Sequence, residues 1–174
     1  MQFITFSLTP ENQAMLPTPQ VAEVLNLDPS QIVPIPDMPA GVMGVCNWRG
    51  QVLWLVDLAY ILGLGAIFAQ DLHYAKHPVL IIRHNNKFLG LAVNKIGNLM
   101  ACDTSKIQPT PTIAMPQMQV LYLCLKGQII DGEGKDMLIL DGNVIIDFLG
   151  KHRHQKEQDL PSSPREVSNL KSEI

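Results

Sequence analysis

Two aspartates, Asp57 and Asp141, come nearest in type and position to the carboxylate pair of a general acid–base catalyst. Each directly follows an apolar run typical of a buried strand, and each precedes an apolar stretch that could begin a short helix. A carboxylate in that place accepts hydrogen bonds from the free backbone N–H groups of the first helical turn. The sequence therefore predicts that Asp57 and Asp141 are structural helix caps rather than catalytic groups.

Three further residues have types that could bind a metal or attack a substrate. His73 and His77 have the spacing that places two imidazoles on one helical face, but no third ligand accompanies them and Pro78 would end the helix. We therefore expect both histidines in a solvated linker. Cys46 lies near Arg49, which could activate a thiol, yet Cys46 belongs to an apolar run without a histidine, as a core cysteine does.

No other motif supports catalysis. The sequence contains neither a Gly-x-Ser-x-Gly elbow nor a phosphate-binding glycine-rich loop with a lysine. The three cysteines are odd in number and widely spaced, so they indicate reduced thiols and neither a disulfide framework nor a zinc site. We expect a protein that is not an enzyme and that has no metal or cofactor.

The composition of the 174 residues narrows the possible partners. Thirteen Lys and Arg against sixteen Asp and Glu give a net charge of −3, which argues against a phosphate-binding surface for nucleic acid. The most hydrophobic uncharged stretch, residues 58–70, is shorter than the ~20 residues of a membrane span and contains glycines. We expect a cytoplasmic protein without direct membrane insertion.

Residues 151–174 differ in composition from the rest of the chain. They contain five Lys and Arg, four Asp and Glu, two prolines and few apolar residues. Such a segment buries too little apolar surface to offset the entropy lost on ordering it. We expect one domain over residues 1–150, with a net charge of −4, and a charged, disordered C-terminal tail over residues 151–174.

The domain contains an internal repeat at an offset of 75 residues. Residues 16–36 and 91–111 share six identities in 21 positions, including Asp28 with Asp103. Average residue usage would give about one identity in such a window. The repeat indicates two related halves with the same local structure.

Short apolar runs separated by turn residues predict a mostly β fold with many short strands. The expected strands are residues 4–8, 13–16, 42–46, 52–56, 79–82, 88–93, 121–125 and 137–140. Asn85 and Asn86 tolerate the positive φ of a tight hairpin turn between two of them. Helix is scarce, and its candidates are residues 20–25, 58–62 and 144–149.

The segment from Gly41 to Gly63 resembles the signature of the CheW family. That signature places an Asn-x-Arg-Gly turn between two apolar runs and then an Asp-Leu and a Leu-Gly pair. The matching residues here are Asn47, Arg49, Gly50, Asp57, Leu58, Leu62 and Gly63, and Val21-Ala22-Glu23-Val24 and Ile35-Pro36 resemble family segments upstream. The second half is less distinctive and departs from the family at Asn94, where Asp is common.

The resemblance implies a pair of intertwined five-stranded barrels with short helices, which agrees with the repeat. It also implies a non-catalytic adaptor that couples the cytoplasmic tips of methyl-accepting chemoreceptors to the regulatory domain of a CheA-type histidine kinase. Some relatives serve systems that control type IV pili, in twitching or phototaxis, rather than flagella. The resemblance further implies recruitment to receptor arrays at the membrane.

The matched turn, formed by Asn47, Trp48, Arg49 and Gly50, is the expected partner-binding site. Arg49 could hold a partner's carboxylate or carbonyl with its planar fork, or it could brace its own loop. Trp48 could be an exposed aromatic anchor or a partly buried turn residue. Trp54 lies on an apolar strand, and we expect it in the core.

A second class of function stays open. Small barrels of short strands also bind single-stranded nucleic acid or small ligands. The net charge of the domain and the lack of a basic stripe with interleaved aromatic residues argue against that alternative.

Overall fold

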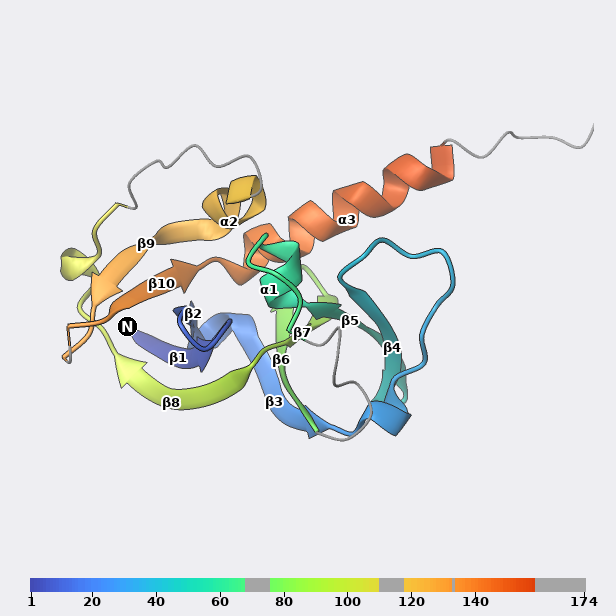
Figure 1. Cartoon of the computed structure of the whole chain (residues 1–174), viewed down its shortest axis with the longest axis horizontal. Coiled ribbons are helices and arrows are strands. Elements are labelled where there is room, and N and C mark those ends of the chain that lie inside the picture. Colours follow the sequence, from blue (N-terminus) through green and yellow to red (C-terminus); the bar gives the residue numbers. More distant parts are fainter. Residues whose placement is uncertain (68–75, 110–117, 133, 159–174) are drawn as a thin grey trace, which may run out of the picture.

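The computed structural model describes residues 1–67, 76–109, 118–132 and 134–158, and these residues are mostly β-strand (Figure 1). The strands are β1 (Gln2–Ser7), β2 (Gln13–Pro17), β3 (Val21–Leu27), β4 (Val42–Trp48), β5 (Gln51–Asp57), β6 (His77–His84), β7 (Lys87–Ala92), β8 (Lys95–Ala101), β9 (Leu125–Ile130) and β10 (Asp136–Leu140). The helices are α1 (Leu58–Ile61), α2 (Gln119–Cys124) and α3 (Gly142–Gln158), with 3-10 turns η1 (Thr18–Gln20), η2 (Pro29–Gln31) and η3 (Thr104–Lys106). The mostly β fold that the sequence predicts is confirmed.

The strands form two five-stranded sheets, and each sheet takes strands from both halves of the chain. Sheet 1 has the order β8-β1-β2-β10-β9, and sheet 2 has the order β3-β6-β7-β5-β4. Two parallel pairs, β2 with β10 and β5 with β7, join the halves within the sheets. Because each half supplies only part of each sheet, the two repeat-related halves are intertwined.

The repeat is visible in two equivalent turns, which follow β3 and β8. Asp28 Oδ1 accepts hydrogen bonds from the backbone N–H of Ser30 at 3.0 Å and from its hydroxyl at 2.7 Å. Asp103 Oδ1 accepts the same two bonds from Ser105 at 3.0 and 2.8 Å. The same local structure thus recurs at the offset that the sequence indicates.

Each sheet closes on itself through a bridge beside a glycine. The chain after β3 pairs through Val33 with the opposite edge strand β4, and the chain after β8 pairs through Gln108 with β9. Gly44 has φ +135°, and a Cβ there would lie 2.3 Å from the carbonyl oxygen of Val33. Gly127 has φ +151°, and a Cβ there would lie 2.6 Å from the carbonyl oxygen of Gln108. The closing segments can approach so closely because both positions lack a side chain.

The apolar core has one shared cluster and one smaller cluster for each sheet. Phe6 and Leu16 of sheet 1 and Leu80 and Leu91 of sheet 2 are fully buried in the shared cluster. The sheet 2 cluster contains Leu27, Cys46, Leu53, Leu55, Val79, Ile81 and Ala92, and the sheet 1 cluster contains Phe3, Met15, Cys102, Met137 and Ile139. Exposing one such Leu or Phe costs about 1.5–3 kcal/mol, so the shared cluster holds the two sheets together.

The structure corrects two of the expected elements. Residues 20–25, expected as a helix, belong mostly to β3, which pairs with β6 and alternates more buried with exposed side chains. Residues 121–125, expected as a strand, belong mostly to α2, where Leu121 and Cys124 are buried at helical spacing. A short apolar run fits either period, and only its tertiary contacts decide between strand and helix.

His77 also departs from expectation, because it is not in a solvated linker. It is the first residue of β6, pairs with Leu27 of β3, and is only 2% exposed. Burial lowers the pKa of His77 below its usual value, and the carboxylate of Asp57 partly opposes that shift. His73, the other histidine of that spacing, lies outside the described residues.

Helix α3 leaves β10 in sheet 1 and packs against β6 and β7 of sheet 2 (Figure 1). Ile145 and Ile146, which lie in the first turns of this helix, are buried. The helix continues to Gln158, past the domain boundary expected at residue 150, and residues 159–174 of the expected tail lie outside the described residues. Within the described part of the chain, no helix is long and apolar enough to cross a membrane.

Candidate partner-binding site

The Asn47–Gly50 segment forms a two-residue turn between β4 and β5. Trp48 and Gln51 pair at the end of the hairpin, and Arg49 and Gly50 have φ of +52° and +76°. Asn47 Oδ1 accepts a hydrogen bond from the backbone N–H of Gly50 at 3.0 Å. The left-handed conformation suits Gly50 but costs about 1–2 kcal/mol at a residue with a side chain. The surrounding fold must therefore hold Arg49 in that conformation.

Arg49 is held by an acidic and an aromatic neighbour. Its Nη2 lies 3.0 Å from Glu23 Oε2, and its guanidinium carbon lies 5.3 Å from the centre of the Trp48 ring. Trp48 Nε1 donates a 2.8 Å hydrogen bond to the same Glu23 oxygen. The loop brace that the sequence leaves open for Arg49 is therefore present. The Arg49 side chain is still 71% exposed, so a partner can reach the guanidinium.

Trp48 is partly buried rather than an isolated exposed anchor. Its ring lies 5.0 Å from that of Phe88, at an interplanar angle of 52°, and it packs against the sheet 2 cluster. A tilted pair of this kind adds about 0.5–1.5 kcal/mol beyond the apolar area that it buries. Trp54 packs against the shared core cluster and is also only partly buried.

Glu23 and Phe88 complete this arrangement, and residue types alone did not single them out. Glu23 lies on β3 and Phe88 on β7, so neither is near the turn in sequence. The available signal for Glu23 was its place in the segment Val21–Val24, which resembles a family segment and contains no other acid. A single acid of this kind does not say which basic residue it will meet.

Asp57 and Asp141 occupy equivalent places after β5 and β10. Asp57 is only 4% exposed, and its two oxygens accept backbone hydrogen bonds from Tyr60 at 3.1 Å and Ile67 at 3.0 Å. Asp141 Oδ1 accepts a hydrogen bond from the backbone N–H of Asn143 at 3.0 Å. Both contacts have the geometry of a carboxylate at a helix start. The two aspartates lie at the ends of strands of different sheets, and each accepts backbone hydrogen bonds at the start of its own helix.

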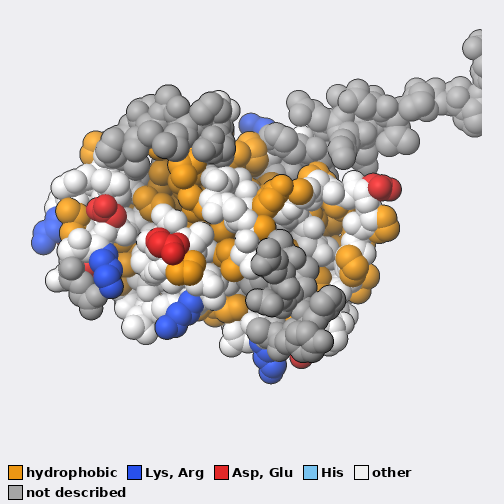
Figure 2. Space-filling model, in the orientation of Figure 1, with side chains coloured by type: hydrophobic (Ala, Val, Ile, Leu, Met, Phe, Trp, Pro, Cys, Tyr) orange, Lys and Arg blue, Asp and Glu red, His pale blue; other side chains and the backbone are white. Residues whose placement is uncertain are grey.

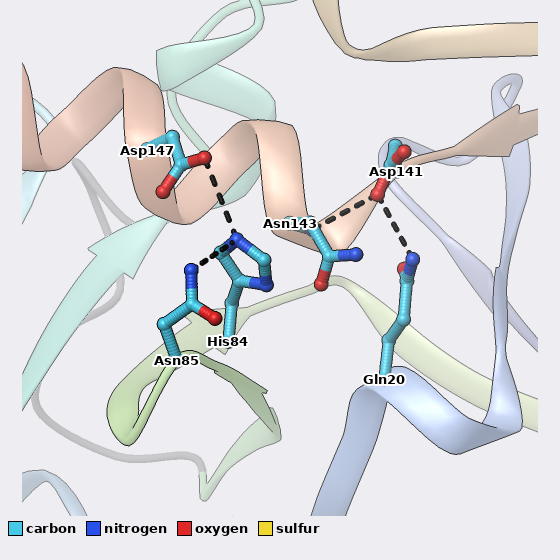
Figure 3. A network of polar contacts seen from close by, with 6 residues as sticks. All are labelled: Gln20, His84, Asn85, Asp141, Asn143 and Asp147. Atoms are coloured by element: carbon cyan, nitrogen blue, oxygen red, sulfur yellow. Dashed lines mark hydrogen bonds and ion pairs between the residues drawn. The ribbon is translucent and has the colours of Figure 1, made fainter.

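Asp141 also links the η1 turn between β2 and β3 to the start of α3 (Figure 3). Gln20 Nε2 donates to Asp141 Oδ1 at 2.9 Å, and Gln20 Oε1 accepts from the backbone N–H of Gly142 at 2.8 Å. Lys126 Nζ lies 3.0 Å from Asp141 Oδ2. Burial alone would raise the pKa of Asp141, but hydrogen bonds from Lys126, Asn143 and Gln20 hold it below its usual value.

The middle of α3 contacts the β6–β7 hairpin through His84 (Figure 3). His84 Nε2 lies 3.5 Å from Asp147 Oδ2 and 2.9 Å from the side-chain nitrogen of Asn85. Asn85 and Asn86 have φ of +48° and +60°, as the sequence predicts for a tight turn. The helix is thus attached to the same hairpin that carries Phe88.

The cysteines do not form a reactive centre. Cys46, Cys102 and Cys124 are all free and buried. Burial raises the pKa of the Cys46 thiol and, with Asp141 nearby, raises that of Cys124 to about 11. Among the described residues, no group of three His, Cys, Asp or Glu side chains could hold a metal ion.

Comparisons with known proteins agree with the resemblance seen in the sequence. The chemotaxis protein CheW of Rhizobium meliloti (strain 1021) is 35% identical over 81 residues, which cover 47% of this chain and 50% of that protein. The chemotaxis protein CheW of Helicobacter pylori (strain ATCC 700392 / 26695) is 30% identical over 123 residues, 70% of each chain. The match thus spans about half the length of the Rhizobium relative.

A solved structure shares the fold. The scaffolding protein TtCheW from Thermoanaerobacter tengcongensis superposes with a TM-score of 0.65 at 22% identity, over 80% of this chain and 82% of that one. The family model described as the CheW-like domain matches residues 2–149, which include both sheets and the Asn47–Gly50 turn. The chain therefore belongs to the family of CheW-like domain proteins.

Proposed function

We propose that this chain is a non-catalytic signalling adaptor that couples chemoreceptors to a CheA-type histidine kinase. The observation that carries the proposal is the family match over residues 2–149. The pathway is chemotaxis or a type IV pilus system for twitching or phototaxis. The adaptor acts in the cytoplasm, where it binds the kinase regulatory domain and the cytoplasmic tip of the receptor at membrane arrays.

Exposed apolar side chains on two repeat-related strands suit a receptor helix. Val24 of β3 is 41% exposed, and Leu99 of β8, 75 positions later in the chain, is 65% exposed. On the face shown in Figure 2, hydrophobic side chains are widespread and charged ones are scattered. An amphipathic partner helix can cover apolar surface of this kind with its own apolar stripe.

The Asn47–Gly50 turn suits a polar contact with a partner. Arg49 is exposed, and Glu23 and Trp48 already fix its position. A side chain held in place before binding loses less conformational entropy when a partner arrives. Its planar guanidinium can then pair with a carboxylate or a carbonyl.

Co-sedimentation of the full chain with its cognate receptor fragment and CheA-type kinase tests the proposal. We expect the parent to form the ternary complex and the Trp48→Ala/Arg49→Ala variant to lose it. Arg49→Ala alone, checked by thermal unfolding, separates lost binding from lost folding. Lys106→Ala, which removes an exposed lysine from the η3 turn, is the matched control and should assemble like the parent.

Failure of the parent protein to bind either partner would contradict the adaptor role. Normal assembly by the folded double variant would remove the turn from the binding site. Submicromolar binding of a single-stranded oligonucleotide at low salt, with no kinase binding, would favour the alternative class of small nucleic-acid-binding barrels.

A further inference from the structure

Four side chains at one end of sheet 2 form a continuous row in the order Arg49, Trp48, Phe88, Arg83, which we call the cation–aromatic row. The Arg49 guanidinium lies over the Trp48 ring, and Trp48 contacts Phe88 at 5.0 Å between ring centres. Phe88 is paired directly with Arg83 across the β6–β7 hairpin. Directly opposite residues of an antiparallel pair point to the same face of a sheet, so Arg83 extends the row.

The row is rigid and accessible. Glu23 fixes Trp48 and Arg49, and the Asn85–Asn86 turn fixes the hairpin that presents Arg83 and Phe88. Phe88 is 37% exposed, and Arg83 is also exposed. A hollow of about 370 Å³ is lined by Arg83, His84, Asn85, Asn86 and Phe88. A partner can therefore place an apolar side chain against Phe88 and a polar group beside Arg83.

The two carboxylates near this end of the sheet already have partners. Glu23 already binds both Arg49 and Trp48, and Asp147 already contacts His84. Among the acidic side chains that the structure describes, none forms an ion pair with Arg83. An exposed guanidinium beside an aromatic ring is well placed to take a carboxylate from another molecule, with two parallel hydrogen bonds.

We infer that the cation–aromatic row binds an acidic segment of the kinase regulatory domain, in which a carboxylate meets Arg83 and an apolar residue meets Phe88. The inference rests on the proposed adaptor function and adds the chemistry of the partner at that site. The exposed apolar side chains of Val24 on β3 and Leu99 on β8 suit a helix with an apolar stripe, whereas this row needs a partner with negative charge. The two partners thus use surfaces of different chemistry.

Calorimetric titration of the full chain with the regulatory domain of the CheA-type kinase from the same genome tests the inference, at several salt concentrations. We expect Arg83→Gln to weaken binding about five- to tenfold and to flatten its salt dependence, because charge contacts of this kind are screened by salt. Arg83→Lys keeps the charge but loses the planar fork, so it should keep the salt dependence with a smaller loss of affinity. Binding to a receptor fragment should not change in either variant.

Lys95→Gln is the matched control, since it removes one positive charge from an exposed position on sheet 1. Unchanged kinase binding and an unchanged salt slope for Arg83→Gln would overturn the inference and leave the adaptor role intact. An equal loss for Lys95→Gln would also overturn it, because net charge rather than the row would then govern binding. A parent protein that binds no regulatory domain would overturn both the inference and the adaptor role.

Discussion

The β4–β5 hairpin of sheet 2 and the β9–β10 hairpin of sheet 1 occupy equivalent places but differ at their tips. The first turns in two residues and carries Arg49 over Trp48. The second has a longer connection, in which Asp131 accepts hydrogen bonds from the backbone N–H groups of Gly134 at 3.1 Å and Lys135 at 2.9 Å. The bodies of both hairpins share a glycine against the closing segment, Gly44 in one and Gly127 in the other.

The comparison separates the part of the repeat that folding needs from the part that can vary. Closure of each sheet depends on close backbone approach, which tolerates no side chain, and it is present in both halves. The hairpin tips project from the sheets and carry little of the core, so their residues can diverge. The hairpin tip of one half can therefore carry side chains that the equivalent tip of the other half lacks.

Substitution of the closing glycines should have the largest effect and should affect the two halves alike. A Cβ at Gly44 or Gly127 would collide with a backbone oxygen, and both positions have φ values that residues with side chains rarely adopt. We expect Gly44→Ala and Gly127→Ala each to lower the free energy of unfolding by about 2–4 kcal/mol. Urea unfolding measures this loss.

Gly50→Ala is the control at a hairpin tip, where a Cβ would meet nothing within 4 Å. Its cost should be limited to the positive φ, at about 1 kcal/mol. If Gly127→Ala proved harmless while Gly44→Ala did not, closure would not be a shared requirement of the two halves.

The pH dependence of stability should differ between the repeat-related positions His77 and Gln2. His77 is buried at the start of β6, whereas Gln2 is exposed at the start of β1. Burial lowers the folded pKa of His77. The contribution of neutral His77 to the free energy of unfolding is therefore fully present above the unfolded pKa of about 6.5. It is lost as the pH falls through the folded pKa, at no more than about 1.4 kcal/mol per pH unit.

His77→Gln, which copies the residue type of the other half, should flatten the loss of thermal stability between about pH 7 and pH 5. A variant with the same slope as the parent would show that other groups cause the acid sensitivity. Scanning calorimetry across that range gives the comparison.

The smallest effect on stability should come from the Arg49–Glu23 pair. The Arg49 side chain is 71% exposed, and ion pairs between exposed groups contribute about 0.2–1 kcal/mol. We expect Arg49→Ala to reduce the free energy of unfolding by less than about 1 kcal/mol, and Lys135→Ala at the other hairpin to change it less. A loss of several kcal/mol in urea unfolding would make Arg49 chiefly a structural residue and would weaken its assignment to partner binding.

Much of the fold could be predicted because its signals are local. Short apolar runs separated by turn residues marked the strands that became β1 and β2, and the Asn85–Asn86 turn marked the β6–β7 hairpin. The predictions that were wrong, at residues 20–25 and 121–125, involve short apolar runs that fit a strand or a helix. His77 was misplaced because nothing near it in sequence shows that β3 pairs beside it.

The candidate site divides in the same way. Asn47, Trp48, Arg49 and Gly50 are contiguous, so the sequence by itself identified the turn and its family. The contacts that orient Arg49 come from Glu23 and those that seat Trp48 come from Phe88, which lie on other strands. Arg83 enters the row only because the hairpin register pairs it with Phe88.

The sequence alone thus determined the position of most strands, the duplicated halves and the family. Each of these features depends on residues that are close together in the chain or repeat at a constant offset. Only the tertiary structure decided which strands share a sheet and which charges meet. Strand pairing depends on the free energy of the whole core, and residues as far apart in sequence as Glu23 and Arg49 come together only after the sheets close. The physical reason is that local patterns record backbone preference, while a binding surface depends on long-range contacts.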